Sequence, residues 1–293
     1  MSITIQKIQY SAQVEKFDNG SINVPTFIKW AGGKTQLLNQ FKSFFPRTFN
    51  KYLEPFIGSG AVFFLIKEVY QPDEIILSDI NPELINCYKV VQTQLLELLE
   101  LLKDHRKNHN KEYYYSIRNL DTSILSEVEL AARFIYLNKT CFNGLYRVNS
   151  KGKFNVPIGS YKNPKIFKEE ILERANSMLQ DVDIITMPFE NVLNHANEGD
   201  FIYFDPPYHP LSSTSNFTSY TKNSFSEKDQ NRLAGVYREL DKKGCQLMLS
   251  NSYSNLILEL YSDYRIEKVS AKRMINCNGN GRGAIAEAVI LNY

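Results

Sequence analysis

The chain has 293 residues, 43% hydrophobic and 23% charged, so it is long enough to bury a sizeable core. No apolar run reaches the length of a membrane span, and the first residues lack a secretory signal pattern, so we expect a cytoplasmic protein. The net charge is only +2, so a polyanionic partner would have to be met by a local basic patch. We predict neither disulfides nor a metal site, because the four cysteines are widely spaced and no histidine lies near them at ligand spacing: Cys87, Cys141, Cys245 and Cys277.

Residues 1–25 are polar with weak periodicity, and we interpret them as an N-terminal extension. The run Gly32-Gly33-Lys34-Thr35 that follows is similar to part of a phosphate-binding loop. Such a loop also requires a glycine five positions before its last glycine, and Ile28 stands there, so this interpretation fails. Taken alone, Lys34 would be a solvated lysine at a helix start and Trp30 a core residue.

A strand, a glycine loop, a helix and a second strand follow in order, which predicts a βαβ unit. The strands are expected at residues 52–57 and 74–78, and the helix at residues 61–69. The loop Gly58-Ser59-Gly60 lets backbone approach a ligand near a helix N-terminus, and Asp79 ends the next strand about 20 residues later. This spacing suits the ribose hydroxyls of a nucleoside-type cofactor. The third glycine of a dinucleotide fingerprint is missing, so NAD is not expected.

The rest of the chain alternates between helical and strand-like segments. Helical patterns cover residues 37–45, a region of helices between about 95 and 180 (95–103, 111–119, 125–139 and from 166), and residues 226–241. Strands are expected at residues 182–186, 200–205, 245–250, 264–269 and 284–291. The sequence therefore predicts an α/β fold, a Rossmann-like sheet interrupted by a mainly helical insertion.

Four apolar or aromatic residues, Phe201-Ile202-Tyr203-Phe204, lead directly into Asp205-Pro206-Pro207-Tyr208. The run is typical of a strand buried on both faces of a parallel sheet, and the two prolines end it because they cannot extend a central ladder. Ligands bind at this end of the strands in open α/β sheets. The carboxylate, the proline carbonyls and the tyrosine ring could accept hydrogen bonds from an exocyclic amino group and stack on a purine. The alternative is a strand followed by an ordinary Pro-Pro turn.

Between residues 130 and 168 there is no acidic residue. The same stretch carries eight basic residues: Arg133, Lys139, Arg147, Lys151, Lys153, Lys162, Lys165 and Lys168. Basic charge supplies affinity for phosphates, and Arg and Asn recognise guanine and adenine edges, so this stretch favours nucleic acid over a solvated loop. Residues 149–153 have the composition of a hairpin tip. A second acid-free stretch, residues 268–286, adds further basic residues: Lys268, Lys272, Arg273 and Arg282.

These motifs, in this order, resemble the Dam-type DNA adenine-N6 methyltransferases, including those that partner GATC-cutting restriction systems. The similarity extends over nearly all of the chain after residue 25, and short matching stretches carry it. They are Phe27-Ile28-Lys29-Trp30-Ala31-Gly32-Gly33-Lys34, Glu54-Pro55-Phe56-Ile57-Gly58-Ser59-Gly60, Asp79-Ile80-Asn81, Asn143-Gly144-Leu145-Tyr146-Arg147, Phe154-Asn155-Val156-Pro157-Ile158-Gly159, Asp205-Pro206-Pro207-Tyr208, Phe217-Thr218-Ser219-Tyr220 and Leu249-Ser250-Asn251.

The resemblance implies an S-adenosylmethionine-binding catalytic domain formed by residues 26–90 and 179–293, and a DNA target-recognition domain formed by residues 91–178. The expected cofactor-binding residues are Trp30, Lys34, Glu54, Phe56, Gly58, Gly60, Asp79 and Asp205. The expected DNA-binding residues are Lys29, Phe142, Asn143, Leu145, Arg147, Lys151, Lys153 and Pro157, with Lys29 and Arg147 near bases.

The expected reaction is methylation of N6 on an adenine flipped out of double-stranded DNA, with GATC as the site. Asp205 and the Pro206 carbonyl would accept hydrogen bonds from N6, and Tyr208 would stack on the base. No metal is expected, and a companion restriction endonuclease acting on the same site is one implied partner. Two alternatives stay open: a methylase of RNA or protein amides, and a DNA-binding module without catalysis.

Overall fold

The computed structural model describes residues 22–210, 225–272 and 284–293. Within these residues it contains a seven-stranded sheet of order β3-β2-β1-β4-β5-β7-β6. The strands are β1 (Lys51–Glu54), β2 (Glu74–Asp79), β3 (Asp183–Thr186), β4 (Phe201–Phe204), β5 (Gln246–Ser252), β6 (Arg265–Lys272) and β7 (Ala284–Leu291). The first five strands pair in parallel, whereas β7 pairs antiparallel with both β5 and β6. The strand order reverses between β1 and β4, so this is where an open sheet of this class binds its ligand.

Both faces of the sheet are buried, because side chains alternate along each strand between two apolar clusters. Tyr52, Phe201 and Tyr203 belong to one cluster, whereas Ile202 and Phe204 belong to the other. The helices beside the sheet are α2 (Leu38–Phe41), α3 (Ala61–Tyr70), α4 (Pro82–Thr93), α9 (Glu227–Lys242) and α10 (Asn255–Leu260), with the short η1 (Lys34–Gln36), η2 (Lys42–Phe44) and η5 (Phe189–Asn194). This arrangement confirms the predicted α/β sheet.

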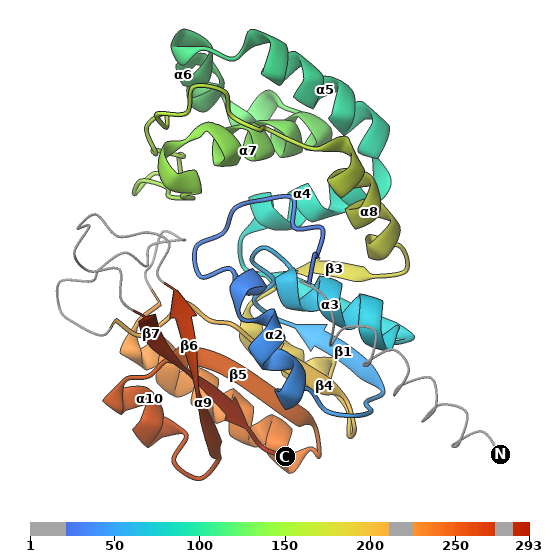
Figure 1. Ribbon diagram of the computed structural model, residues 1–293, viewed down its shortest axis with the longest axis vertical. Helices are drawn as coiled ribbons and strands as arrows, with labels where there is room; N and C mark the ends of the chain where they lie inside the picture. Colours follow the sequence, from blue (N-terminus) through green and yellow to red (C-terminus); the bar gives the residue numbers. More distant parts are fainter. Residues whose placement is uncertain (1–21, 211–224, 273–283) are drawn as a thin grey trace.

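The insertion forms a helical layer beside the sheet (Figure 1). It contains α5 (Leu95–Asn108), α6 (Lys111–Asn119), η3 (Thr122–Ile124), α7 (Glu127–Thr140), η4 (Phe142–Gly144) and α8 (Glu169–Leu179). Helix α4 contacts both α7 and α8, so it joins this layer to the sheet. Leu98, Tyr114 and Phe134 of the insertion belong to the same core cluster as Phe63 of α3. The insertion is therefore packed onto the sheet through one continuous core.

Several element ends differ from the sequence expectations for local reasons. Strand β1 ends at Glu54 rather than at residue 57, because Pro55 has no N–H to continue the ladder. The expected amphipathic helix over residues 37–45 is divided into short turns. Helix α9 begins as predicted, with a reciprocal capping box between Ser226 and Asp229.

The expected hairpin tip has an antiparallel bridge between Val148 and Phe154 at its base. The Asn149 side chain accepts hydrogen bonds from the backbone N–H groups of Lys151 and Lys153, and Gly152 takes φ of +76°. This geometry presents both lysines on an ordered turn. No helix in the described ranges is long and apolar enough to cross a membrane. The expectations for residues 1–21, Phe217-Thr218-Ser219-Tyr220, Arg273, Arg282 and Cys277 lie outside the described residues.

Candidate active site

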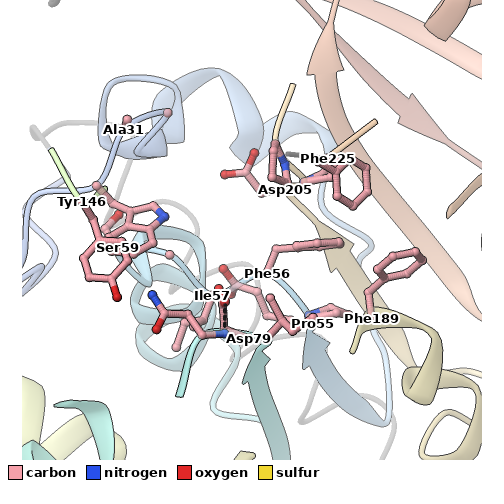
Figure 2. Close-up of a pocket in the computed structure, with 18 of the residues that line it drawn as sticks. Ala31, Pro55, Phe56, Ile57, Ser59, Asp79, Tyr146, Phe189, Asp205 and Phe225 are labelled. Carbon is pink, nitrogen blue, oxygen red and sulfur yellow. Dashed lines mark hydrogen bonds between the residues drawn. The ribbon is translucent and has the colours of Figure 1, made fainter. Parts of the chain in front are cut away.

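A pocket of about 830 Å³ lies at the carboxyl ends of β1, β2 and β4. Most of the predicted cofactor and catalytic residues line it: Trp30, Lys34, Glu54, Phe56, Gly58, Asp79, Asp205, Pro206 and Tyr208. Parallel strands place their carboxyl ends along one edge of the sheet, so residues far apart in the sequence meet here. In the view of Figure 2, the Phe56 side chain lies between Asp205 and Asp79.

Asp205 sits directly after β4 and is engaged by two other side chains. The Lys34 ammonium lies 2.6 Å from Oδ1 and 2.7 Å from Oδ2, and the Ser250 hydroxyl donates to Oδ1 at 3.1 Å. The Tyr203 and Ser250 hydroxyls are in turn hydrogen-bonded to each other at 2.9 Å. Burial raises the pKa of the Asp205 carboxyl, and the Lys34 ammonium opposes that rise. The lysine therefore favours an ionised acceptor inside an apolar sheet edge.

Lys34 is only 3% exposed, so the interpretation of a solvated helix-start lysine is wrong. Its ammonium also donates to the Gly32 carbonyl at 2.5 Å and lies 4.7 Å from the centroid of the Tyr208 ring. A buried ammonium needs such partners because desolvation of a charge is costly. The lysine thus ties the Gly32-Gly33 turn to the Asp205-Pro206-Pro207-Tyr208 segment.

Glu54 is a second buried carboxyl, at the end of β1. It is 2% exposed and accepts a hydrogen bond from the Tyr52 hydroxyl at 2.7 Å. Burial raises the pKa of Glu54 well above its usual range, although the hydrogen bond from Tyr52 opposes the rise. The negative charge of Asp205 raises the pKa of Glu54 further.

Asp79 ends β2 on the other side of the pocket. Its Oδ1 accepts a hydrogen bond from the Asn81 backbone N–H at 2.9 Å, while the Asn81 side chain caps α4. Burial raises the pKa of Asp79 to about 6, and backbone hydrogen bonds from Asn81 and Gly58 oppose the rise. The next residue, Ile80, also lines the pocket and is 58% exposed, so an apolar side chain stands open beside the carboxylate.

The glycine loop between β1 and α3 requires glycine at both ends. Gly58 has φ of +48°, and a Cβ there would lie 2.8 Å from Cδ1 of Trp30. Gly60 has φ of +69° as the N-cap of α3, and a Cβ there would lie 2.8 Å from the Tyr88 hydroxyl. Gly60 does not itself line the pocket, whereas Gly58 does. Gly60 therefore serves to start α3, whereas Gly58 brings backbone to the pocket wall.

Two phenylalanines of the pocket are absent from the sequence-predicted set. Phe189 stacks on Phe56 with ring centroids 5.5 Å apart, and Phe225 packs against both rings at 5.9 and 6.0 Å (Figure 2). Phe189 follows β3 by three residues, at the same sheet edge as Asp79. Extending the strand-end rule to β3 points to Phe189, whereas no sequence signal marks Phe225.

A family model described as D12 class N6 adenine-specific DNA methyltransferase matches residues 30–275, which spans the pocket and the insertion. The chain belongs to this family. Membership confirms the resemblance drawn from the sequence and makes the protein an enzyme that methylates N6 of adenine in DNA. The alternatives of an RNA or protein-amide methylase and of a module without catalysis are set aside.

The methyltransferase has relatives of similar length. It is 48% identical over 289 residues to the type II methyltransferase M.MjaIII of Methanocaldococcus jannaschii, covering 93% of this chain and 100% of that relative. It is 46% identical over 278 residues to the type II methyltransferase M1.LlaDCHI of Lactococcus lactis subsp. cremoris, covering 93% and 96%. A DNA adenine methylase of Vibrio cholerae is 36% identical over 268 residues, covering 90% and 95%.

The residues predicted to bind DNA lie on the insertion and on the segment before the glycine turn. The exposed ones are Lys29, Phe142, Asn143, Arg147, Lys151, Lys153 and Pro157, and Leu145 is half-buried. The Lys29 side chain packs over Gly144, and its backbone is held by the Asn138 side chain. Arg147 Nε donates to Asn155 Oδ1 at 2.7 Å, so its guanidinium is oriented across the hairpin.

Two of the eight basic residues in the acid-free stretch do not belong to this surface. Arg133 is 4% exposed and donates to the carbonyls of Ile117 and Arg118 near the end of α6. Lys139 is half-buried, and burial lowers its pKa to about 8. Counting charges along the sequence therefore overstates the basic surface, because helix α7 turns both side chains toward the interior.

The hairpin also forms part of the pocket wall, which the sequence did not indicate. Tyr146, Val148 and Gly152 line the pocket together with the predicted cofactor-binding residues. The Tyr146 ring stacks on Trp30 with centroids 5.7 Å apart and an interplanar angle of 26°. The residue that precedes Arg147 is thus in contact with the glycine turn, so the predicted DNA-reading and cofactor-binding segments meet at Tyr146.

Proposed function

We propose that the methyltransferase takes its methyl group from S-adenosylmethionine and modifies an adenine flipped out of duplex DNA, with GATC as the target. The observation that carries this proposal is the pocket itself. It joins Asp205, at the end of β4, to Asp79, at the end of β2, across an aromatic wall. One end offers acceptors for an amino group, and the other offers a carboxylate for ribose hydroxyls.

The residues present fit this cofactor. The Asp79 carboxylate can accept from ribose hydroxyls, and the exposed Ile80 side chain beside it offers an apolar surface to a purine ring. Gly58 lets backbone approach without a side chain, and the buried Glu54 and Lys34 also line the pocket. When bound, S-adenosylmethionine supplies an electrophilic methyl group on a positively charged sulfonium.

The protein then has to orient the adenine and the methyl group and to complement the charge that develops between them. Asp205 and the Pro206 carbonyl accept hydrogen bonds from the N6 hydrogens, which keeps the nitrogen lone pair directed at the methyl group. Both oxygens of Asp205 contact Lys34 in this structure, so the lysine has to share the carboxylate with the incoming amino group. Tyr208 supplies a flat surface for the extruded base.

We propose that residues 91–178 recognise the target, with Lys29 and Arg147 reading bases and Lys151 and Lys153 contacting phosphates. Phe142, Asn143, Leu145 and Pro157 would contact the DNA surface around them. Support comes from their exposure on one hairpin and its neighbouring turn, beside the pocket. The names of two relatives as type II methyltransferases support a companion restriction endonuclease that acts on the same site.

The test is methyl transfer from tritiated S-adenosylmethionine to duplexes that contain GATC or each of its single-base variants. We expect label on GATC only, blocked cleavage by a nuclease that requires unmethylated GATC, and no label with Asp205→Ala. Label on a different duplex would overturn the target sequence while leaving the chemistry. Failure of S-adenosylmethionine to bind by calorimetry would overturn the cofactor assignment.

A further inference from the structure

The hydroxyl of Tyr208 donates a hydrogen bond of 2.6 Å to Oε2 of Glu287. Glu287 lies on β7 and pairs with Ser252 of β5, two residues beyond the Ser250 that bonds Asp205. The antiparallel addition of β7 to the sheet thus brings a carboxylate to a tyrosine 79 positions earlier in the chain. Nothing in the methyl-transfer scheme above uses this carboxylate.

Tyr208 is also held from a second direction. The Lys34 ammonium lies 4.7 Å from the centroid of its ring, which covers one of the two ring faces. A base can therefore stack only on the other face. A hydrogen bond at the hydroxyl and a cation on one face together define both the tilt of the ring and the side on which it is available.

The charges around the ring favour the reaction. Three charged groups lie together here: the Lys34 ammonium contacts both Asp205 and the Tyr208 ring, and the Glu287 carboxylate accepts the Tyr208 hydroxyl. Two of these groups are carboxylates and one is an ammonium. Methylation of N6 places positive charge on the base until a proton leaves. A hydrogen bond from the phenol to a carboxylate also makes the ring more electron-rich, which strengthens its attraction for a cationic base.

We propose that Glu287 is a positioning residue for methyl transfer, which accepts the Tyr208 hydroxyl so that the ring face opposite Lys34 receives the target adenine. This inference rests on the proposed function, in which Tyr208 stacks on an extruded base. The charge of Glu287 also raises the pKa of Asp205. Glu287 does not touch the reacting atoms, so its positioning effect must pass through Tyr208. That requirement makes the inference testable by a double-mutant cycle.

The cycle compares Glu287→Ala, Tyr208→Phe and the double variant by single-turnover methylation at saturating S-adenosylmethionine and target duplex. We expect Glu287→Ala to slow methylation about tenfold, the scale of one hydrogen bond to a charged group. In the Tyr208→Phe background, which has no hydroxyl, the same change should alter the rate by less than about twofold. Glu287→Gln should lose less of the rate than Glu287→Ala, because its amide oxygen still accepts the hydroxyl although the charge is removed.

A second readout follows the base itself. With 2-aminopurine at the target position, Glu287→Ala should lengthen the fluorescence lifetime of the extruded base, in the same direction as Tyr208→Ala, because stacking on the ring is weakened. Glu267→Ala is the matched control, since Glu267 lies on the neighbouring β6 and pairs with Arg265 at the surface. It should change neither readout.

Equal losses from Glu287→Ala in both backgrounds, or an unchanged lifetime, would overturn the positioning role. A Tyr208→Ala variant with wild-type rate and lifetime would instead overturn base stacking, so the two failures are distinguishable. S-adenosylmethionine affinity and thermal unfolding report whether each variant folds. If the alanine variant does not fold, Glu287→Thr replaces it in the same cycle, with the same expected result. Threonine suits a strand, and its side chain is too short to reach the Tyr208 hydroxyl.

Discussion

A single buried ammonium, that of Lys34, contacts both carboxylate oxygens of Asp205, at 2.6 and 2.7 Å. The two residues are 171 positions apart and come from the first glycine turn and the end of β4. Burial alone would favour a protonated, neutral Asp205, which would be a poorer acceptor for an amino group. The lysine therefore opposes protonation of the proposed catalytic acceptor.

Replacing this lysine should shift the pH dependence of methylation. In Lys34→Met the opposing positive charge is lost, so the pKa of Asp205 should rise further and the acid limb of the rate profile should move to higher pH. We expect at least about a tenfold loss at pH 7, the scale of a charge-assisted hydrogen bond, with partial recovery at higher pH. The measurement is single-turnover methylation from pH 5.5 to 9.5.

The matched control is Lys242→Met, at a remote exposed site at the end of α9. It should leave both the rate and the profile unchanged. A Lys34→Met enzyme whose activity falls by the same factor at every pH would show that the lysine acts only on binding or packing.

Asp79 should make the protein without cofactor less stable above pH 6. Its folded-state pKa of about 6 lies above the ordinary 3.8, so its contribution to stability is fully present below pH 3.8 and is lost as pH rises through 6. Asp79→Asn retains an oxygen for the Asn81 N–H and avoids the buried charge. We expect it to raise the free energy of unfolding at pH 7.5 by up to about 3 kcal/mol, with the gain vanishing near pH 3.8.

The same variant should lose affinity for S-adenosylmethionine, because an amide accepts ribose hydroxyls less strongly than a carboxylate. Calorimetry at pH 7.5 measures this loss, and urea unfolding at several pH values measures the stability. Affinity for a target duplex without cofactor should stay unchanged. Weaker DNA binding with intact cofactor binding would contradict the assignment of Asp79 to the ribose.

Gly58 should tolerate no side chain. In Gly58→Ala the new Cβ would meet the Trp30 ring at 2.8 Å, and φ of +48° is unfavourable for alanine by about 1–2 kcal/mol. We expect lower thermal stability and weaker cofactor binding, since Trp30 and Gly58 line the same pocket. Gly235→Ala in α9 is the control: nothing lies within 4 Å of its Cβ position, so alanine should stabilise that helix by about 0.5–1 kcal/mol. Equal effects of the two changes would contradict the steric argument.

The ends of β2 and β4 were predictable from sequence, and with them the carboxylates Asp79 and Asp205. Each follows an apolar run of strand length, and parallel strands must end at one edge. The environment of Lys34 was not predictable in this way, because its partner is distant in sequence and the turn itself is similar to a solvated helix start. The inward direction of the Lys34 side chain depends on the sheet, which brings Asp205 next to the glycine turn.

In the insertion, the hairpin was predictable from sequence, but the burial of individual basic residues was not. Its hairpin and exposed lysines follow from turn composition, because Asn149 and Gly152 suit the backbone that the tip adopts. Whether a basic residue faces solvent depends on the packing of α7, and so Arg133 was assigned to the surface although it is buried. Contact between Tyr146 and Trp30 is a property of the tertiary fold, and no local pattern marks it.

The last prediction separates base reading from phosphate binding on this hairpin. Arg147 is exposed, and its guanidinium is oriented by Asn155 at 2.7 Å, which suits bidentate contact with a guanine edge. Arg147→Ala should cost about 1–3 kcal/mol on the GATC duplex and little on single-base variants, so specificity relaxes. Asn155→Ala should show part of the same effect, because the guanidinium loses its orientation.

Lys151→Ala is the matched comparison on the same turn. As a phosphate contact it should weaken binding to all duplexes alike, and it should reduce the slope of log affinity against log salt by about one ion. Binding and methylation rates on GATC and its variants, each at several salt concentrations, distinguish the two classes. If Arg147→Ala lowered activity equally on every sequence and flattened the salt dependence as Lys151→Ala does, Arg147 would be a phosphate contact, and the base-reading role would have to lie with other side chains of the insertion or with Lys29.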